Sequence, residues 1–314
     1  MATHQSSGRW RLGILLALLT AACWATLPLA LKLTLEQVDP ITLTWFRFLV
    51  AAVLMGAWFA WQGRLTSNYR GLSPRHWVMM GTAGVMLLGN YVFYLLGVQY
   101  TTPGNAQLLI QLAPLLMALG GIVVFKEHFA WAQWLGLGLI ALGLGLFFSE
   151  QQAGQGKGYA FGAGLVVLAA GVWAVYALLQ KQLLTRLSSP AILWAIYLLS
   201  ALLLWPFAAP SELLKLDAFH AALLAYCALN TLVAYGAFAE ALAHWEASRV
   251  SAILATTPIL CVGAVGLVHG LWPGLIAPER LGVLGWTGAL LVLAGSASAS
   301  LLSRRAAIVK ERSA

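Results

Sequence analysis

Two stretches of the chain, residues 12–31 (LGILLALLTAACWATLPLAL) and residues 158–180 (GYAFGAGLVVLAAGVWAVYALLQ), are long apolar runs with a Trp-Ala pair inside. They belong to a pattern that occurs twice. Four residues recur at separations of 149, 150, 144 and 152, namely Trp24 as Trp173, Pro40 as Pro190, Pro114 as Pro258 and Glu127 as Glu279. Separations this similar predict a duplication with small insertions.

The composition predicts that this duplicated unit lies in a membrane. Hydrophobic residues make up 61% of the chain and charged residues 9%, with a mean hydropathy of +0.83, whereas soluble domains carry roughly 25% charged residues. Ten runs are long enough to cross the roughly 30 Å hydrocarbon layer as helices of about 20 residues, at 12–31, 41–61, 77–99, 105–125, 130–148, 158–180, 191–208, 219–243, 249–270 and 281–302. The runs show no alternation, so helices are expected and barrel strands are not.

The distribution of Lys and Arg predicts the orientation of these spans. Ten spans put both termini on one side, and if that side is the cytoplasm, the inner segments hold 13 basic residues against 4 outside. This asymmetry follows the positive-inside rule. It also accounts for the net charge of +8, which therefore indicates topology and not nucleic-acid binding. Because five spans per repeat is an odd number, the second repeat must be inverted relative to the first, as in many secondary transporters.

The predicted fold is therefore an all-α polytopic membrane protein with ten transmembrane helices in two inverted five-helix repeats. We expect a first repeat at 1–148, a linker at 149–157, a second repeat at 158–302 and a basic cytoplasmic tail at 303–314. The first run is expected to remain as a helix, because signal-peptide cores span only about 7 to 15 residues. The three cysteines, Cys23, Cys227 and Cys261, fall inside spans, which argues against a disulfide framework and against a metal site.

Several motifs resemble the EamA-type branch of the drug/metabolite transporter superfamily. They are Pro40-Ile-Thr-Leu-Thr-Trp-Phe-Arg47-Phe, then Asn105-Ala-Gln-Leu-Leu-Ile-Gln-Leu-Ala-Pro114 with Phe125-Lys-Glu127, and a second copy at Ala252–Pro258 and Pro278-Glu279-Arg280. The resemblance covers nearly the whole chain. It implies a bacterial inner-membrane exporter of small metabolites, amino acids prominently, without a cofactor. Within that branch the Trp/Tyr-rich spans look most like aromatic amino-acid exporters of the YddG type.

Polar residues inside the first repeat are candidates for a substrate pathway. Arg47 is about seven residues into its span, roughly 10 Å deep, where a guanidinium could attract a substrate carboxylate or, alternatively, reach outward to the interface. The remaining candidates in this repeat are Asn90, Tyr91, Tyr94, Gln107 and Gln111. The two glutamines are spaced to share one helix face. Amides and phenols suit a zwitterion, although they also join helices inside membranes.

The second repeat supplies its own candidates. Asn230 and Tyr235 are polar positions, with Tyr235 equivalent to Tyr91, while Tyr197 stands where the first repeat has Arg47. Trp24 and Trp173 lie near the middle of their spans, where aromatic rings could stack on a planar side chain or pack within the bundle. Tyr176, three residues after Trp173, is a further candidate for substrate binding. Pro28, Pro114 and Pro258 are expected to act as hinges or gates, or as static kinks.

The acidic residues bear on the mechanism. None of the ten lies clearly at mid-membrane, so facilitated alternating access is expected, and proton-coupled export of other metabolites or drugs is the alternative. Glu127 and Glu279 are predicted to cap helix ends at opposite faces. An intramembrane enzyme is a further alternative, but the chain has no HExxH or Gly-x-Ser-x-Gly motif. The expected partners are a small-molecule substrate and membrane lipid, with no nucleic acid and no metal, in a monomer or homodimer.

Overall fold

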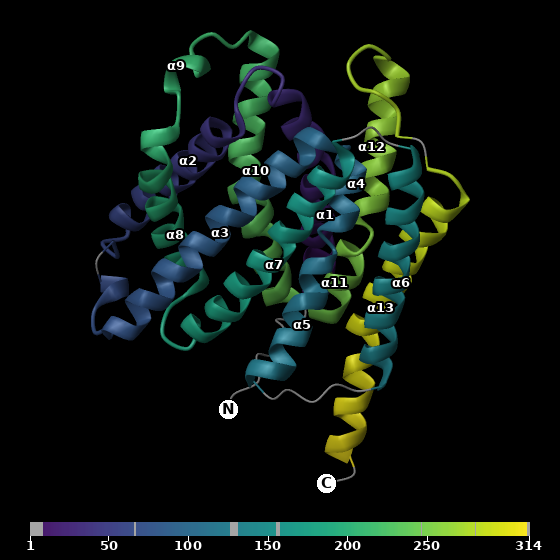
Figure 1. Ribbon diagram of the computed structural model, residues 1–314. Helices are drawn as coiled ribbons and strands as arrows, with labels where there is room; N and C mark the ends of the chain where they lie inside the picture. The colour runs from purple at the N-terminus through teal and green to yellow at the C-terminus, as the bar shows by residue number, and fades with distance from the viewer. Residues whose placement is uncertain are drawn as a thin grey trace.

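The computed structural model describes residues 9–65, 67–125, 131–154, 158–245, 247–279 and 281–312, and within these ranges the chain is helical with no strand (Figure 1). The first repeat contains α1 (Trp10–Thr34), α2 (Pro40–Trp61), η1 (Ser67–Tyr69), α3 (Pro74–Tyr100), α4 (Pro103–Leu109), α5 (Leu112–Phe125) and α6 (Trp131–Gly154). The second contains α7 (Tyr159–Leu183), α8 (Ser189–Leu204), η2 (Trp205–Phe207), α9 (Pro210–Leu213), α10 (Ala218–His244), α11 (Ala247–Leu254), α12 (Thr257–Leu271) and α13 (Val283–Arg312). Eight segments of the described residues are long and apolar enough to cross a membrane. The predicted all-α polytopic fold is confirmed.

Two predicted spans, 105–125 and 249–270, are each divided into two helices. In the first, Pro114 has no N–H for the carbonyl of Ile110, and that carbonyl instead accepts from the N–H of Ala113 at 2.9 Å. In the second, Pro258 leaves the carbonyl of Leu254 without its helical donor, and the hydroxyl of Thr257 donates to it at 2.5 Å. Both breaks therefore follow from a proline in the same place in the repeat.

The inversion of the repeats is visible in how α6 crosses α13. A Cβ atom on Gly143 would lie 2.5 Å from the carbonyl oxygen of Gly288, and one on Gly295 would lie 2.5 Å from that of Gly136. Residue numbers rise along one helix while they fall along the other, so these equivalent helices run antiparallel. Glycines at such crossings let two backbones approach within the membrane.

The other main contacts also pair helices of one repeat with helices of the other. The helix α3 packs on α7, just as its equivalent α10 packs on α1, and α2 packs on its own equivalent α8. The amide of Asn90 on α3 donates to the carbonyl of Ala169 on α7 at 3.0 Å. At the equivalent place, Thr20 on α1 donates to the carbonyl of Ala234 on α10 at 3.5 Å. The contacts thus define a two-fold relation that passes between α2 and α8.

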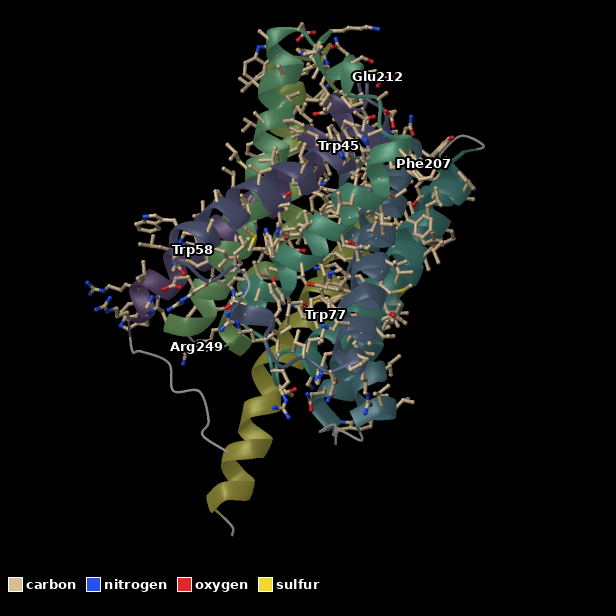
Figure 2. All side chains as sticks on the ribbon, turned by 90° about the vertical axis from the view of Figure 1, so that its left-hand side faces the viewer. Trp45, Trp58, Trp77, Phe207, Glu212 and Arg249 are labelled. Atoms are coloured by element: carbon tan, nitrogen blue, oxygen red, sulfur yellow. The ribbon has the colours of Figure 1, made fainter. Side chains whose placement is uncertain are left out.

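The two ends of the bundle differ in charge. We call the end that carries both chain termini the terminal end and the opposite end the distal end (Figure 1). Most described acidic residues lie at the distal end, namely Glu36, Asp39, Glu150, Glu212, Asp217 and Glu279, beside two basic residues, Lys32 and Lys215. Figure 2 shows Glu212 and Phe207 toward the distal end and Trp77 and Arg249 toward the terminal end. Most other Arg and Lys residues lie at the terminal end.

Exposed tryptophans mark both ends as well. Trp61 and Trp131 are 84% and 80% exposed at the terminal end, and Trp205 and Trp272 are 58% and 59% exposed at the distal end. Trp side chains favour the interface between membrane and water. These exposed tryptophans are therefore candidates for aromatic belts near both ends of the helices.

Two predicted boundaries differ from the helices observed. The helix α6 continues to Gly154 and so takes in residues 149–154 of the predicted linker, and α13 continues into the predicted tail as far as Arg312. No proline interrupts either stretch, and Glu150 accepts from the N–H groups of Gly282 and Gly285 at 2.7 and 2.9 Å. Glu127, which was predicted to cap a helix end, lies outside the described residues.

Candidate functional site

A buried arginine lies where three helices of both repeats meet. Arg47, on α2, is only 3% exposed. Its Nε donates to the hydroxyl of Thr231 on α10 at 3.3 Å, and its guanidinium carbon lies 4.7 Å from the ring centroid of Tyr91 on α3. A guanidinium over an aromatic face gains a cation–π interaction. Arg47 therefore does not extend outward to the membrane interface, which was one of its two predicted roles.

Tyrosines surround this guanidinium. The side chain of Tyr91 lies close to those of Thr231 and Tyr235. Tyr197, on α8, is 1% exposed and lies within electrostatic reach of Arg47 and Tyr91, yet its hydroxyl makes no hydrogen bond of good geometry with the described residues. Tyr176, on α7, is close to Tyr91. We call Arg47, Tyr91, Tyr176, Tyr197, Thr231 and Tyr235 the arginine cluster.

Arg47 and Tyr197 occupy equivalent positions, 150 residues apart. Because α2 packs on α8 at the two-fold relation, equivalent residues of these two helices come together there. Phe48, the residue after Arg47, packs against both Tyr91 and Tyr197, with ring centroids 4.6 Å and 5.6 Å away. The repeat therefore departs from symmetry at its own axis, where one copy supplies a cation and the other a phenol.

The arginine cluster has no internal counter-anion. Among the described residues, no carboxylate lies within ion-pair distance of Arg47. Glu240, one of the described acids outside the distal group, lies near the terminal end and pairs with His244 at 3.0 Å. An unpaired charge inside a membrane protein is costly and points to a functional site.

Tyr94 and Gln107 form a second polar pair. The hydroxyl of Tyr94 on α3 donates to Oε1 of Gln107 on α4 at 3.1 Å, and Gln107 is 9% exposed. Gln111 lies in the break between α4 and α5. The prediction that both glutamines share one helix face is wrong, because α4 ends at Leu109.

The predicted aromatic pair is separated in the structure. Trp24 packs against Tyr235 and Phe238 of α10, each with ring centroids at 5.7 Å. Trp173 packs against Tyr176 on its own helix, at 6.3 Å. No ring contact among the described residues joins Trp24 to Trp173. Each borders the arginine cluster through a tyrosine.

The two asparagines serve the contacts between helices. The amide of Asn90 is used in the bond to α7 described above. The amide nitrogen of Asn230 donates to the carbonyl of Cys23 at 2.9 Å and to the hydroxyl of Tyr226 at 3.0 Å. The oxygen of Asn230 makes no hydrogen bond with the described residues. These donors join α3 to α7 and α10 to α1.

The three prolines occupy two kinds of place. Pro114 and Pro258 lie in the first turn of α5 and α12, next to the helix breaks, whereas Pro28 is buried within α1, which continues past it. A cavity of about 10 Å³ borders Pro258, Gly104 and Trp286. It is about as large as one water molecule requires, so it is not a substrate site.

Thr231 and Phe48 were not predicted. Each lies one turn or less from a predicted residue, Phe48 beside Arg47 and Thr231 one turn from Tyr235. The pairing of α2 with α8 and of α2 with α10 decides that they face the same point. Arg47 and Tyr197 are equivalent positions of the two repeats, and this equivalence was the signal in the sequence that could have located the two-fold axis between α2 and α8.

A model of the EamA-like transporter family matches residues 11–149 and 160–301. The chain is 38% identical to "Uncharacterized inner membrane transporter YhbE" of Escherichia coli K12 over 91% of this chain and 90% of that protein. It is 34% identical to an "Uncharacterized transporter" of Haemophilus influenzae, covering 91% and 93%.

More distant similarities cover almost as much of the chain. A "Probable amino-acid metabolite efflux pump" of Escherichia coli K12 is 23% identical, covering 89% of this chain and 92% of that protein. A solved crystal structure, 21% identical, superposes with a TM-score of 0.63 over 96% of this chain and 99% of that chain. That likeness concerns the fold alone. The finer resemblance to aromatic amino-acid exporters stays a prediction.

Proposed function

Because the chain belongs to the EamA-like transporter family, we propose that it exports amino acids with aromatic or large apolar side chains. Export occurs by facilitated alternating access across the inner membrane of a bacterium. The Escherichia coli relative is named an inner membrane transporter, and a more distant one a probable amino-acid metabolite efflux pump. Both names support a small-molecule substrate.

The observation that carries this proposal is the buried, unpaired charge of Arg47. Arginine has five N–H donors arranged to bind a carboxylate through two parallel hydrogen bonds. In the structure, Nε is bound to Thr231, and no described carboxylate neutralises the charge. A substrate carboxylate would supply the missing anion.

The surroundings of Arg47 suit the rest of such a substrate. Phenol hydroxyls and the Gln107 oxygen are acceptors for an ammonium group. The ring of Phe48 lies 4.6 Å from that of Tyr91 and 5.6 Å from that of Tyr197, and a planar side chain gains by stacking among such rings. Arg47 is a single cation, which favours a substrate with one carboxylate over a phosphorylated substrate.

The difference in charge between the two ends of the bundle supports the proposed direction of transport, which is export. Arg64, Arg70, Arg75, Arg186 and Arg249 all lie at the terminal end. Under the positive-inside rule this end faces the cytoplasm. Both termini are then cytoplasmic, and substrate leaves through the distal end.

Uptake of a matched substrate panel into proteoliposomes tests the proposal. Phenylalanine, tryptophan and leucine are compared with phenethylamine, which lacks the carboxylate, and with 3-phenylpropionate, which lacks the ammonium. We expect transport of the amino acids without a pH gradient, and none of phenethylamine. Transport of no amino acid contradicts the substrate class. Strict dependence on the gradient contradicts the facilitated mechanism and favours proton-coupled export.

A further inference from the structure

The turn between α3 and α4 is held by a cation from α1. Nζ of Lys32 donates to the carbonyl oxygens of Val98, Gln99 and Thr101 at 2.8, 2.7 and 2.8 Å. An ammonium has three donors, and all three are directed at the C-terminal end of α3. A cation in this place also interacts favourably with the dipole of a long helix.

A carboxyl group from the other repeat holds the same turn. Glu279 lies in the connection between α12 and α13, and its Oε1 accepts from the N–H of Gly104 at 2.6 Å. Its carboxyl group also lies close to the side chain of Thr102. A Cβ atom on Gly104 would collide with this carboxyl group, so the glycine is what lets Glu279 approach the backbone.

The segment held in this way is joined to Tyr94, a neighbour of Arg47. All seven residues of α4 are buried, and α4 packs on α12 of the other repeat. Gln107, halfway along α4, is bonded to Tyr94, and Tyr94 is within electrostatic reach of both Arg47 and Glu279. Movement of α4 away from α12 would therefore open a path from the distal end toward Arg47.

We propose that Lys32 and Glu279 form a lock that closes the distal end by clamping the turn between α3 and α4. This inference rests on the proposed transport function, and it adds the residues that control access to the site. They are positioning residues, because neither one touches the arginine cluster. Opening the distal end requires the carbonyls of α3 to leave Lys32 and the N–H of Gly104 to leave Glu279.

The repeat supplies an internal comparison at the opposite end. Lys181 is equivalent to Lys32, at the separation of 149 that also relates Trp24 to Trp173. It lies in the last turn of α7, at the terminal end. Removing either lysine removes one positive charge from the last two turns of equivalent helices. Under the two-fold relation, the equivalent role of Lys181 is to close the terminal end while the distal end is open. The lock therefore predicts opposite effects of the two changes: loss of Lys32 favours opening of the distal end, and loss of Lys181 favours its closure.

Labelling of a buried reporter cysteine tests the lock without any substrate. The reporter is Ala106→Cys, in a background where the three native cysteines are replaced, because Ala106 is 0% exposed on α4. A membrane-impermeant maleimide is added from the distal side. We expect Lys32→Met and Glu279→Ala to increase the labelling rate by about tenfold or more. Glu279→Gln, whose amide oxygen still accepts from Gly104, should stay close to the parent protein.

Lys181→Met should slow the labelling of the same reporter. A general loss of packing would speed labelling in both lysine variants, so equal increases would overturn the lock. Unchanged labelling in Lys32→Met and in Glu279→Ala would overturn it too. If Lys32→Met fails to fold, the contrast between Glu279→Ala and Glu279→Gln decides. The labelling needs no substrate. Its result therefore tests the lock even if the transport experiment contradicts the proposed amino-acid export.

Discussion

Arg47 and Tyr91 form a cation–π pair with 4.7 Å between the guanidinium carbon and the ring centroid. Both residues are buried, and they belong to neighbouring helices of the same repeat. Thr231, which accepts a hydrogen bond from Arg47, and Tyr235, which lies close to Tyr91, come from the second repeat. A motion that separates the repeats would therefore change the surroundings of the charge at the place where we expect the substrate carboxylate to bind.

Replacement of Arg47 separates a functional charge from a structural one. Arg47→Gln should weaken binding of phenylalanine by about tenfold or more, because hydrogen bonds to charged groups contribute about 1.5–3 kcal/mol. Arg47→Lys should bind with intermediate affinity, since a single ammonium lacks the planar fork. Binding is measured by scintillation proximity with the purified protein.

The thermal stability of Arg47→Gln gives a second result. A buried charge without an anion is unfavourable, so the midpoint of thermal unfolding in detergent should be unchanged or higher. Arg64→Gln removes the same charge from an exposed site at the terminal end and is the matched control, with no expected effect on binding. A strong loss of stability in Arg47→Gln with binding retained would assign Arg47 to helix packing instead.

Replacing Gln107 and replacing Gln111 should have different effects on transport. Gln107→Ala removes the acceptor of the Tyr94 hydroxyl and leaves a buried donor without a partner, which costs about 1–3 kcal/mol. We expect slower phenylalanine transport in this variant and near-normal transport in Gln111→Ala, whose residue lies in the helix break. Initial rates in proteoliposomes give the comparison. Equal losses in both variants would restore the shared face predicted from their spacing.

Hydropathy predicted the spans, apart from the breaks beside Pro114 and Pro258, and the odd number of spans per repeat predicted the inversion, because both depend on patterns that persist over many residues. The crossing of α6 and α13 illustrates this. Gly136 and Gly143 have equivalents 152 residues later in Gly288 and Gly295, so a two-fold relation requires the glycines to face one another once the helices pair.

The composition of the candidate site could not be predicted in the same way. Asn90 and Tyr91 are neighbours in the chain, and both were assigned to the pathway. The amide of Asn90 donates to α7, while the ring of Tyr91 covers Arg47. Which side of α3 faces α7 depends on packing between helices far apart in sequence. The same holds for Thr231, whose hydroxyl meets Arg47 only because α10 packs on α2.

The glycine crossing predicts a large and specific effect on stability. A Cβ atom on Gly288 would lie 2.5 Å from the carbonyl oxygen of Gly143 and 2.9 Å from the backbone nitrogen of Phe147. Backbone atoms cannot turn aside as side chains do, so Gly288→Ala should lower the free energy of unfolding by about 1–3 kcal/mol. Thermal unfolding followed by circular dichroism in detergent measures the change.

Gly145→Ala is the matched control on α6. A Cβ atom there would have no neighbour within 4 Å, and alanine favours a helix over glycine by up to about 1 kcal/mol. This variant should be as stable as the parent or more so. If Gly288→Ala and Gly145→Ala had the same effect, the close approach of α6 and α13 would be wrong.

Glu279 should make the distal lock sensitive to pH. Burial raises the pKa of Glu279 above its usual value, although the hydrogen bond from Gly104 and the nearby side chain of Thr102 lower it in part. Cys261 of α12 and Tyr94 of α3 also face this carboxyl group. When the lock opens, the group enters water and its pKa falls toward about 4.3. The locked state therefore binds a proton more readily, and a falling pH favours it.

The maleimide labelling of Ala106→Cys should therefore slow as the pH on the distal side is lowered from about 8 to about 5. Each labelling rate is divided by the rate for the unfolded protein at the same pH, which removes the effect of the titration of the thiol itself. Glu279→Gln should abolish this dependence. Asp217→Asn should preserve it, because hydrogen bonds from His220 lower the pKa of Asp217 to about 2, so that Asp217 stays charged throughout. Labelling that accelerates at low pH would mean that the ionised carboxylate, through its bond to Gly104, is what holds the lock closed.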